Sequence, residues 1–206
     1  MSMTYEEAQF EEWMDKLYAE HSQQAIEEFT IERLQSFYLK NPKLAEAPLS
    51  ALDGARVLLR TNPSASLIFA VIAIEVGLKV VLLKPLVYGL VHSESVASLI
   101  TELTIGHTGI DRFRQLLFQI LAEHRGIDLE NFKRDGYQKT LWEEITEVQK
   151  RRNAIIHRAD SATSDNAKQA IEVGSIILET LFPTMVKKLG LHLHERVWIC
   201  NDWRCK

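Results

Sequence analysis

The sequence predicts an all-α fold, an antiparallel bundle of amphipathic helices, and three observations lead to this prediction. Apolar residues recur at the three- and four-residue spacing of a helix in almost every segment of the chain. Strand-like alternation of apolar and polar residues is confined to the tail, residues 191–206. No glycine-rich phosphate loop, internal repeat or low-complexity segment interrupts the helical pattern. Together these features indicate a helical bundle with enough chain for one core.

Each helix is predicted from an apolar stripe and from the residues that begin or end it. Residues 4–20 and 25–38 read as two helices of an appended hairpin, which the prolines of KNPKLAEAP separate from a short helix over 50–60. The turn TNPS begins a long apolar helix at residue 64, with its end marked by Pro85 and Gly89. The remaining predicted helices are 93–103 capped by Ser93, 111–125 ended by Gly126, 139–157, and 165–189 bent at Pro183 and ended by Gly190. The chain therefore divides into an N-terminal helical extension (1–50), a bundle (51–190) and a C-terminal arm or strand (191–206).

Composition limits the classes of function. The net charge of −4 and the pI near 6.0 argue against coating of nucleic acid by bulk charge, but they leave a local basic site open. The two cysteines, Cys200 and Cys205, lie close to the C-terminus and give no disulfide framework, so a reducing cytoplasm is the expected location. The acidic start MSMTYEEAQFEEW has no apolar stretch and is not expected to be a signal peptide.

The longest apolar run, residues 64–91, raises the question of a membrane-spanning helix. Glu75 and Lys79 fall inside this run, and Lys84 and Pro85 follow. A spanning helix needs about 20 nearly uncharged residues, and charges at its centre are costly. We therefore expect a buried core helix and no membrane partner, with Glu75 at a paired or functional position.

One arginine departs from the pattern of its own helix. On a helical projection Leu141, Ile145 and Val148 fall on one apolar stripe together with Ile155 and Ile156, and Arg152 falls at about 20°, inside that stripe. Three explanations are open. Arg152 lies at the edge of the stripe with its head in water, or it pairs with a buried acid, for which Glu75 is the candidate, or it binds an anion such as phosphate in a cleft.

The same segment carries a motif. Arg-Asn-Ala-Ile-Ile-His, Arg152 to His157, has an arginine, a polar residue directly after it, and a histidine after four intervening residues. Upstream, AVIAIEVGLKVVLL is an alanine-containing apolar helix with a central glutamate, Glu75. These features resemble the HEPN superfamily (higher eukaryotes and prokaryotes nucleotide-binding domains), over roughly residues 53–189. The resemblance implies a HEPN-like helical bundle with the motif near the end of a late core helix.

The resemblance also implies a chemistry. Catalytic HEPN proteins are metal-independent endoribonucleases whose motif helices line one cleft shared by two subunits, so RNA and a homodimer partner are expected and no cofactor. His157 would be the general base or acid, because its pKa lies near working pH. Arg152 would bind the scissile phosphate, Asn153 would orient the imidazole or a phosphate oxygen, and Glu75 would be accessory. The expected products are a 2',3'-cyclic phosphate and a 5'-OH.

Other functions remain open on the same residues. Lys150, Arg151 and Arg158 are the remaining basic residues of the segment and the candidates for RNA binding. Many HEPN proteins lack nuclease activity, so a helical module that binds nucleotide, RNA or a partner protein is the alternative. A nuclease of this kind would be a toxin or phage-defence effector, for which an antitoxin or regulatory protein is a further expected partner.

The tail holds a cluster of residues with metal-ligand character. His192, His194, Cys200 and Cys205 are the residue types that bind zinc. The spacing CNDWRC lacks the tight interval of common zinc ribbons, so the sequence favours an exposed or packed tail over a metal site. If the tail is a strand, His192 and His194 share one face of it.

Overall fold

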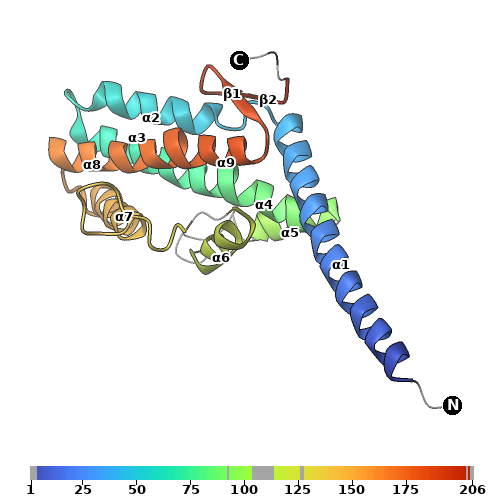
Figure 1. The fold of residues 1–206 in the computed structure, drawn as a ribbon. Helices are drawn as coiled ribbons and strands as arrows, with labels where there is room; N and C mark the ends of the chain where they lie inside the picture. The colour runs from blue at the N-terminus through green and yellow to red at the C-terminus, as the bar shows by residue number, and fades with distance from the viewer. Residues whose placement is uncertain (1–3, 92, 104–113, 126–127, 203, 205–206) are drawn as a thin grey trace.

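The all-α prediction is confirmed by a computed structural model, which describes residues 4–91, 93–103, 114–125, 128–202 and 204 (Figure 1). A small antiparallel hairpin, β1 (His192–His194) and β2 (Trp198–Cys200), forms the predicted C-terminal strand segment. The helices are α1 (Tyr5–Lys40), α2 (Glu46–Leu58), α3 (Pro63–Val76), α4 (Lys84–Leu90), α5 (Glu94–Thr101), α6 (Arg114–Arg125), α7 (Leu141–Arg158), α8 (Ser164–Ser175) and α9 (Phe182–Lys188), and η1 (Gly77–Leu83) and η4 (Ile176–Leu181) are π-helical stretches. The predicted cap Gly126 and residues 111–113 lie outside the described residues.

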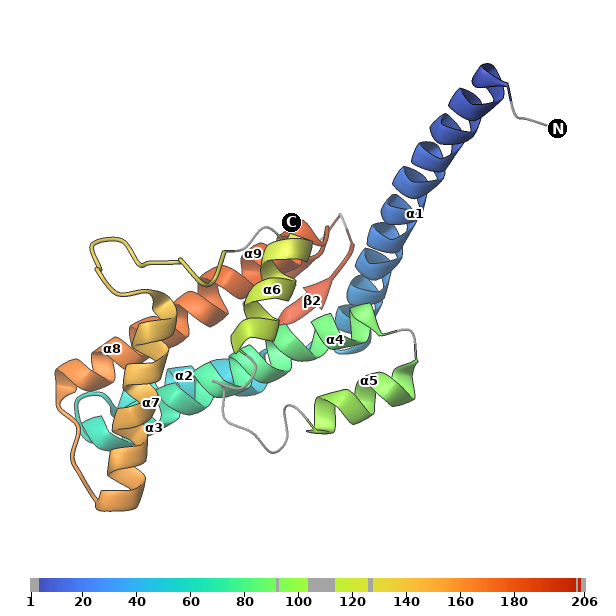
Figure 2. The same cartoon turned by 90° about the horizontal axis from the view of Figure 1, so that it is seen from below.

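The body of the protein is a layer of helices crossed by α7. In Figure 1 helices α2, α3 and the α8–η4–α9 rod lie side by side, whereas α7 is seen nearly end-on beneath them. Figure 2, turned by 90°, shows α7 running across the same layer. The core between these helices contains Leu52, Ile74, Ile145 and Ile177, each with no exposed surface. The crossing of α7 over this layer determines which residues of α7 are buried and which are exposed to solvent.

Both long rods of the body continue through a proline, which differs from the prediction that Pro85 marks a helix end. The π-helical stretch η1 lies directly before α4, and η4 lies directly before α9. The last amide before each proline, from Lys84 and Phe182, donates to the carbonyl five residues earlier. A proline supplies no N–H to a helix, and the wider π turn accommodates this loss without ending the rod. Gly77 lets the two π-helical stretches meet, since a Cβ there would lie 2.9 Å from the side chain of Leu178.

The rod from Pro63 to Leu90 is the apolar run that raised the membrane question. By length and composition it could cross a membrane, and 61% of its most apolar window is buried inside the protein. The rod therefore packs most of its most apolar window against the other helices of the bundle.

The N-terminal segment is one helix rather than the predicted hairpin of two. Helix α1 runs unbroken for 36 residues, and its first half projects away from the body (Figures 1 and 2). The residues between the two predicted helices, 21–24, contain neither glycine nor proline, and glutamine is a good helix former, so the helix continues through them. Phe10 and Trp13 on the projecting half are exposed, so Trp13 is not a core residue. Among the other tryptophans Trp142 is buried and Trp198 is exposed, and Trp203 lies outside the described residues.

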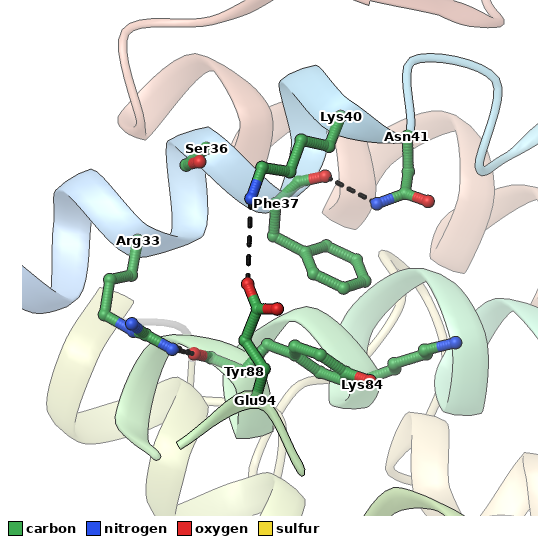
Figure 3. A pocket seen from close by; sticks show the side chains of 8 residues that line it. All are labelled: Arg33, Ser36, Phe37, Lys40, Asn41, Lys84, Tyr88 and Glu94. Atoms are coloured by element: carbon green, nitrogen blue, oxygen red, sulfur yellow. Dashed lines mark hydrogen bonds and ion pairs between the residues drawn. The ribbon is translucent and has the colours of Figure 1, made fainter. Parts of the chain in front are cut away.

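The second half of α1 packs into the body. Leu34 and Tyr38 are buried in the same core as α3 and α8. Helix α4 approaches closely because Gly89 has no side chain; a Cβ there would lie 2.7 Å from Cγ of Leu34. Arg33 donates to the carbonyl oxygen of Tyr88 near the end of α4, at 3.0 and 3.1 Å (Figure 3). It also donates to the carbonyl oxygen of Val91 at 2.8 Å. These contacts attach α1 to the bundle.

Candidate functional site

Helix α7 carries the motif, and local sequence sets both its ends. Thr140 and Glu143 form a capping box, in which the Thr140 amide donates to the Glu143 carboxylate at 2.7 Å and the Glu143 amide donates to the Thr140 hydroxyl at 3.3 Å. The helix ends at Ala159, which adopts the left-handed conformation with φ of 55°. The motif Arg152 to His157 therefore occupies the last two turns of α7.

The apolar stripe of α7 is buried only in its first half. Leu141, Ile145 and Val148 are fully buried, whereas Ile155 is half-buried and Ile156 is 46% exposed. Because α7 crosses the layer of helices, its last two turns leave the core. Arg152 lies where the stripe emerges, so its charge is not surrounded by the bundle interior.

Arg152 is half-buried and forms no ion pair with any residue that the structure describes. Its Nη1 donates to Oδ1 of the neighbouring Asn153 at 3.0 Å, and its Nε is buried without a hydrogen-bond partner. A buried guanidinium N–H without a partner is costly. The pairing with Glu75 considered from the sequence is not present. Glu75 instead accepts a hydrogen bond from the Gln149 amide at 3.4 Å.

His157 and Asn153 lie one turn apart and both are exposed on α7. Within the described residues the His157 imidazole makes no hydrogen bond or ion pair, so both ring nitrogens are available to an external ligand. The structure thus brings together Arg152, Asn153 and His157 on the emerging end of one helix. Glu75 lies beside the same helix through Gln149, one turn before Arg152. This group can bind an anion and transfer a proton.

The basic residues around the motif differ in how far their charge is neutralised. Arg151 pairs with Glu147 at 2.7 Å and also contacts Gln169. Hydrogen bonding from Lys139, together with the charge of Arg151, lowers the pKa of Glu147 below its usual range. Arg158 pairs with Asp160 at 3.3 Å. Of the three predicted RNA-binding residues, only Lys150 has no carboxylate partner among the residues described.

A pocket of about 440 Å³ opens beside the first turns of α7. It contains Trp142 and Thr146, which begin the polar strip that ends in Asn153 and His157. Its charged lining consists of the cations Arg114, Lys139 and Lys150 and the anions Glu143 and Glu147. Because Lys139 pairs with Glu147 at 2.7 Å in this lining, the positive charge of the pocket is partly neutralised.

The most buried ion pair among the described residues is one that sequence patterning missed. Arg134, in the loop before α7, donates to both carboxylate oxygens of Glu144 at 2.5 and 2.8 Å, and to Glu172 at 2.7 Å. Its guanidinium lies 3.7 Å from the ring centre of Tyr137. The hydrogen bonds that Arg134 donates to the Glu144 carboxylate hold the pKa of Arg134 above its usual range. Glu144 stands next to Glu143 near the start of α7, yet the loop before the helix covers it and leaves 1% of its side chain exposed.

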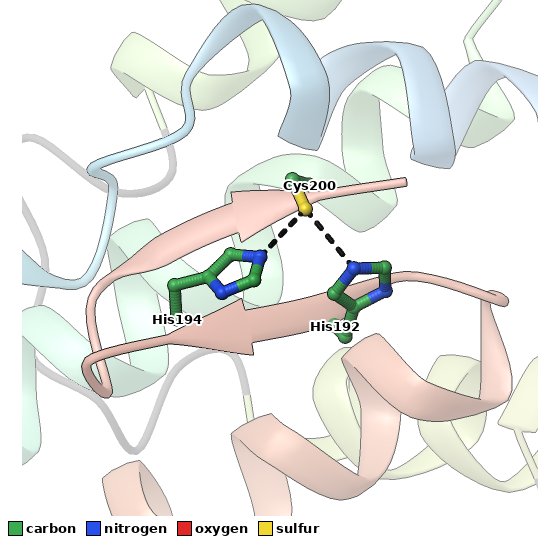
Figure 4. Close-up of side chains that lie close together, drawn as sticks. All are labelled: His192, His194 and Cys200. Carbon is green, nitrogen blue, oxygen red and sulfur yellow. Dashed lines mark hydrogen bonds between the residues drawn. The ribbon is translucent and has the colours of Figure 1, made fainter. Parts of the chain in front are cut away.

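The tail residues suspected as metal ligands also come together. His192, His194 and Cys200 converge on one face of the β1–β2 hairpin (Figure 4). Cys205 lies outside the described residues. A further pocket, of about 350 Å³ between α1 and α4, is lined by Arg33, Lys40 and Lys84, and Lys40 pairs there with Glu94 at 3.7 Å (Figure 3).

Comparison with known proteins found no relative of this chain. No protein-family model, curated protein or solved structure matches the chain.

Proposed function

We propose that the chain is a metal-independent endoribonuclease that cleaves RNA by attack of a ribose 2'-OH, in a cleft formed by the α7 helices of two copies. The observation that carries this proposal is the state of Arg152, a guanidinium at the emerging end of α7 with no acidic partner in the described chain. The HEPN-like motif and the position of His157 one turn beyond Asn153 agree with it.

In this reaction the 2'-oxygen forms a bond to phosphorus while the bond from phosphorus to the 5'-oxygen breaks. One His157 accepts the proton of the 2'-OH, and the His157 of the second copy donates a proton to the leaving 5'-oxygen. Arg152 stabilises the additional negative charge on the phosphate in the transition state. Asn153, which already contacts Arg152, orients the guanidinium toward the phosphate. The reaction gives a 2',3'-cyclic phosphate and a 5'-OH.

A second copy of the chain would supply the second proton-transfer group that the reaction needs. One α7 presents a single exposed imidazole, and acid–base catalysis at two oxygens uses two proton-transfer groups. Apolar side chains are exposed near the motif, with Ile156 on α7 and Ile72 one turn before Glu75 on α3. Contact between copies would cover these side chains and exclude water from the cleft. The proposal places this dimer in the cytoplasm as a toxin or defence effector under the control of an antitoxin or regulatory protein.

A catalytically inactive module that binds nucleotide, RNA or a protein is the second candidate. The ion pairs of Arg151 and Arg158 favour it, because they reduce the positive charge available for RNA beside the motif.

The proposal is tested by replacing Arg152 with methionine and following RNA cleavage in EDTA. We expect cleavage to fall by about 10²–10³-fold, since methionine keeps the apolar stem and removes the donor to the phosphate. Arg151→Met is the matched control, because Arg151 is the adjacent arginine and is already paired with Glu147. Its cleavage rate should stay within about threefold of the native rate. Equal losses in both variants would contradict a specific role for Arg152, and RNA binding without cleavage by the native chain would support the inactive module.

A further inference from the structure

The C-terminal hairpin gathers three metal-binding side chains around one point. His192 and Cys200 are cross-strand partners in the antiparallel register, and His194 lies on the same face of β1 as His192. Each imidazole turns its Nε2 toward the Cys200 sulfur, at 3.1 Å from His192 and 2.8 Å from His194 (Figure 4). The two imidazole rings are 5.2 Å apart and nearly perpendicular. Three side chains from two strands therefore point their donor atoms inward.

This arrangement has the size of a zinc site. The ligand atoms all lie within 4.8 Å of one another, and all three side chains are half-buried. Bond lengths of about 2.0–2.1 Å to nitrogen and about 2.3 Å to sulfur place tetrahedral ligands about 3.6 Å apart. The side chains would need to move outward by only a fraction of an ångström to admit the ion. Imidazole nitrogen and thiolate sulfur are also the donors that zinc prefers over calcium or magnesium.

The scaffold that presents these ligands is anchored to the body. The Ile199 amide donates to the Pro42 carbonyl at 2.9 Å, and its side chain is 1% exposed. At the turn of the hairpin, Arg196 pairs with Glu179 of η4 and with Asp53 of α2. A site on an anchored hairpin loses little conformational entropy when it binds an ion.

We propose that His192, His194 and Cys200 bind one Zn²⁺ and leave its fourth position to water. Binding replaces the thiol proton of Cys200, which passes to solvent, with a bond from sulfur to zinc. The ion joins β1 to β2 and so fixes the hairpin that holds the C-terminal segment against α1 and α2. This site is separate from the motif on α7, since the hairpin and α7 lie on opposite sides of the helical layer (Figure 1).

The test is metal binding by the full chain, purified with a reducing agent that does not chelate metals. The native chain should bind one equivalent of zinc and, with Co²⁺, show the near-ultraviolet charge-transfer absorbance of a cobalt–thiolate bond. Cys200→Ser should lose that absorbance, and His192→Ala and His194→Ala should each weaken binding by at least about tenfold. His21→Ala removes an exposed histidine of α1 and is the matched control, with native affinity expected.

Two results would overturn the proposal. One is a native chain that binds no zinc and gives no thiolate absorbance with Co²⁺, a result that depends on no variant. The other is an unchanged absorbance in Cys200→Ser, with helical circular dichroism confirming that the variant is folded. Neither readout involves RNA, so the zinc site and the nuclease proposal can fail independently.

Discussion

Replacing His157 with alanine is expected to lower the rate of RNA cleavage by about 10²–10⁴-fold. In the proposed reaction this imidazole is the proton-transfer group of the motif. It is exposed and makes no hydrogen bond or ion pair with any residue described in the structure, so its removal should leave the fold intact. Initial rates on a short RNA, in EDTA, with each variant at equal concentration, measure the effect.

The matched control for this prediction is His21→Ala, which removes an exposed histidine far from α7. Its rate should equal the native rate, and the thermal unfolding temperature of His157→Ala should lie close to that of the native chain. Native-like cleavage by His157→Ala would exclude the imidazole from the reaction. Cleavage that co-purifies with the protein but is equal in all variants would identify a contaminating nuclease.

Replacing Arg134 with methionine is expected to lower the free energy of unfolding by about 3–5 kcal/mol. Arg134 and Glu144 are a buried pair, with 8% and 1% of their side chains exposed. Removal of the guanidinium leaves the Glu144 carboxylate buried without its two hydrogen bonds, and the loop before α7 loses its contact with Glu172. Denaturant unfolding followed by helical circular dichroism gives the change in stability.

A double variant distinguishes the buried charge from lost packing. Arg134→Met combined with Glu144→Leu removes both charges, so it should be more stable than Arg134→Met alone. Arg151→Met, which breaks a partly exposed pair, should change stability by at most about 1 kcal/mol. A stability change of that small size in Arg134→Met would contradict the assignment of Arg134 as the structural arginine of the bundle.

The helix ends could be predicted from the sequence where capping residues next to them determine where the helix begins or ends. Asn62 caps α3 by accepting from the Ala65 amide at 3.0 Å, and Gly190 follows the last helix with φ of 70°, as the sequence indicates. Pro85 does not end the helix, because the π turn before it accommodates the proline, and helix propensity does not predict such a turn. The break predicted between residues 20 and 25 does not form, because residues 21–24 contain neither glycine nor proline.

The candidate site was predicted in part. Helical periodicity placed Arg152, Asn153 and His157 on neighbouring faces of one helix, and the structure has them there. Periodicity could not show that the crossing of α7 ends burial after Val148, because that depends on the angle between helices. It likewise could not show that the loop containing Arg134 folds over Glu144, a contact made by residues outside any repeating pattern.

In the C-terminal tail, the sequence predicted which residues share a strand face but not which residues pair across the strands. Alternation of residues predicted that His192 and His194 would share a strand face. The distance from both to Cys200 depends on the register of the β1–β2 hairpin, which pairs His192 with Cys200. Spacing along the chain gave no sign of this register, because the turn residues Glu195 and Arg196 have positive φ that their identities do not predict.

The nature of the RNA ends tests the central claim most directly. The native chain, incubated with a defined RNA in EDTA, should produce fragments with a 2',3'-cyclic phosphate and a 5'-OH, because the 2'-oxygen is the nucleophile. Blocking that oxygen by 2'-O-methylation at the cut site should abolish the cut. Fragments with a 5'-phosphate, or RNA that stays intact at every protein concentration, would contradict a ribonuclease built on Arg152 and His157.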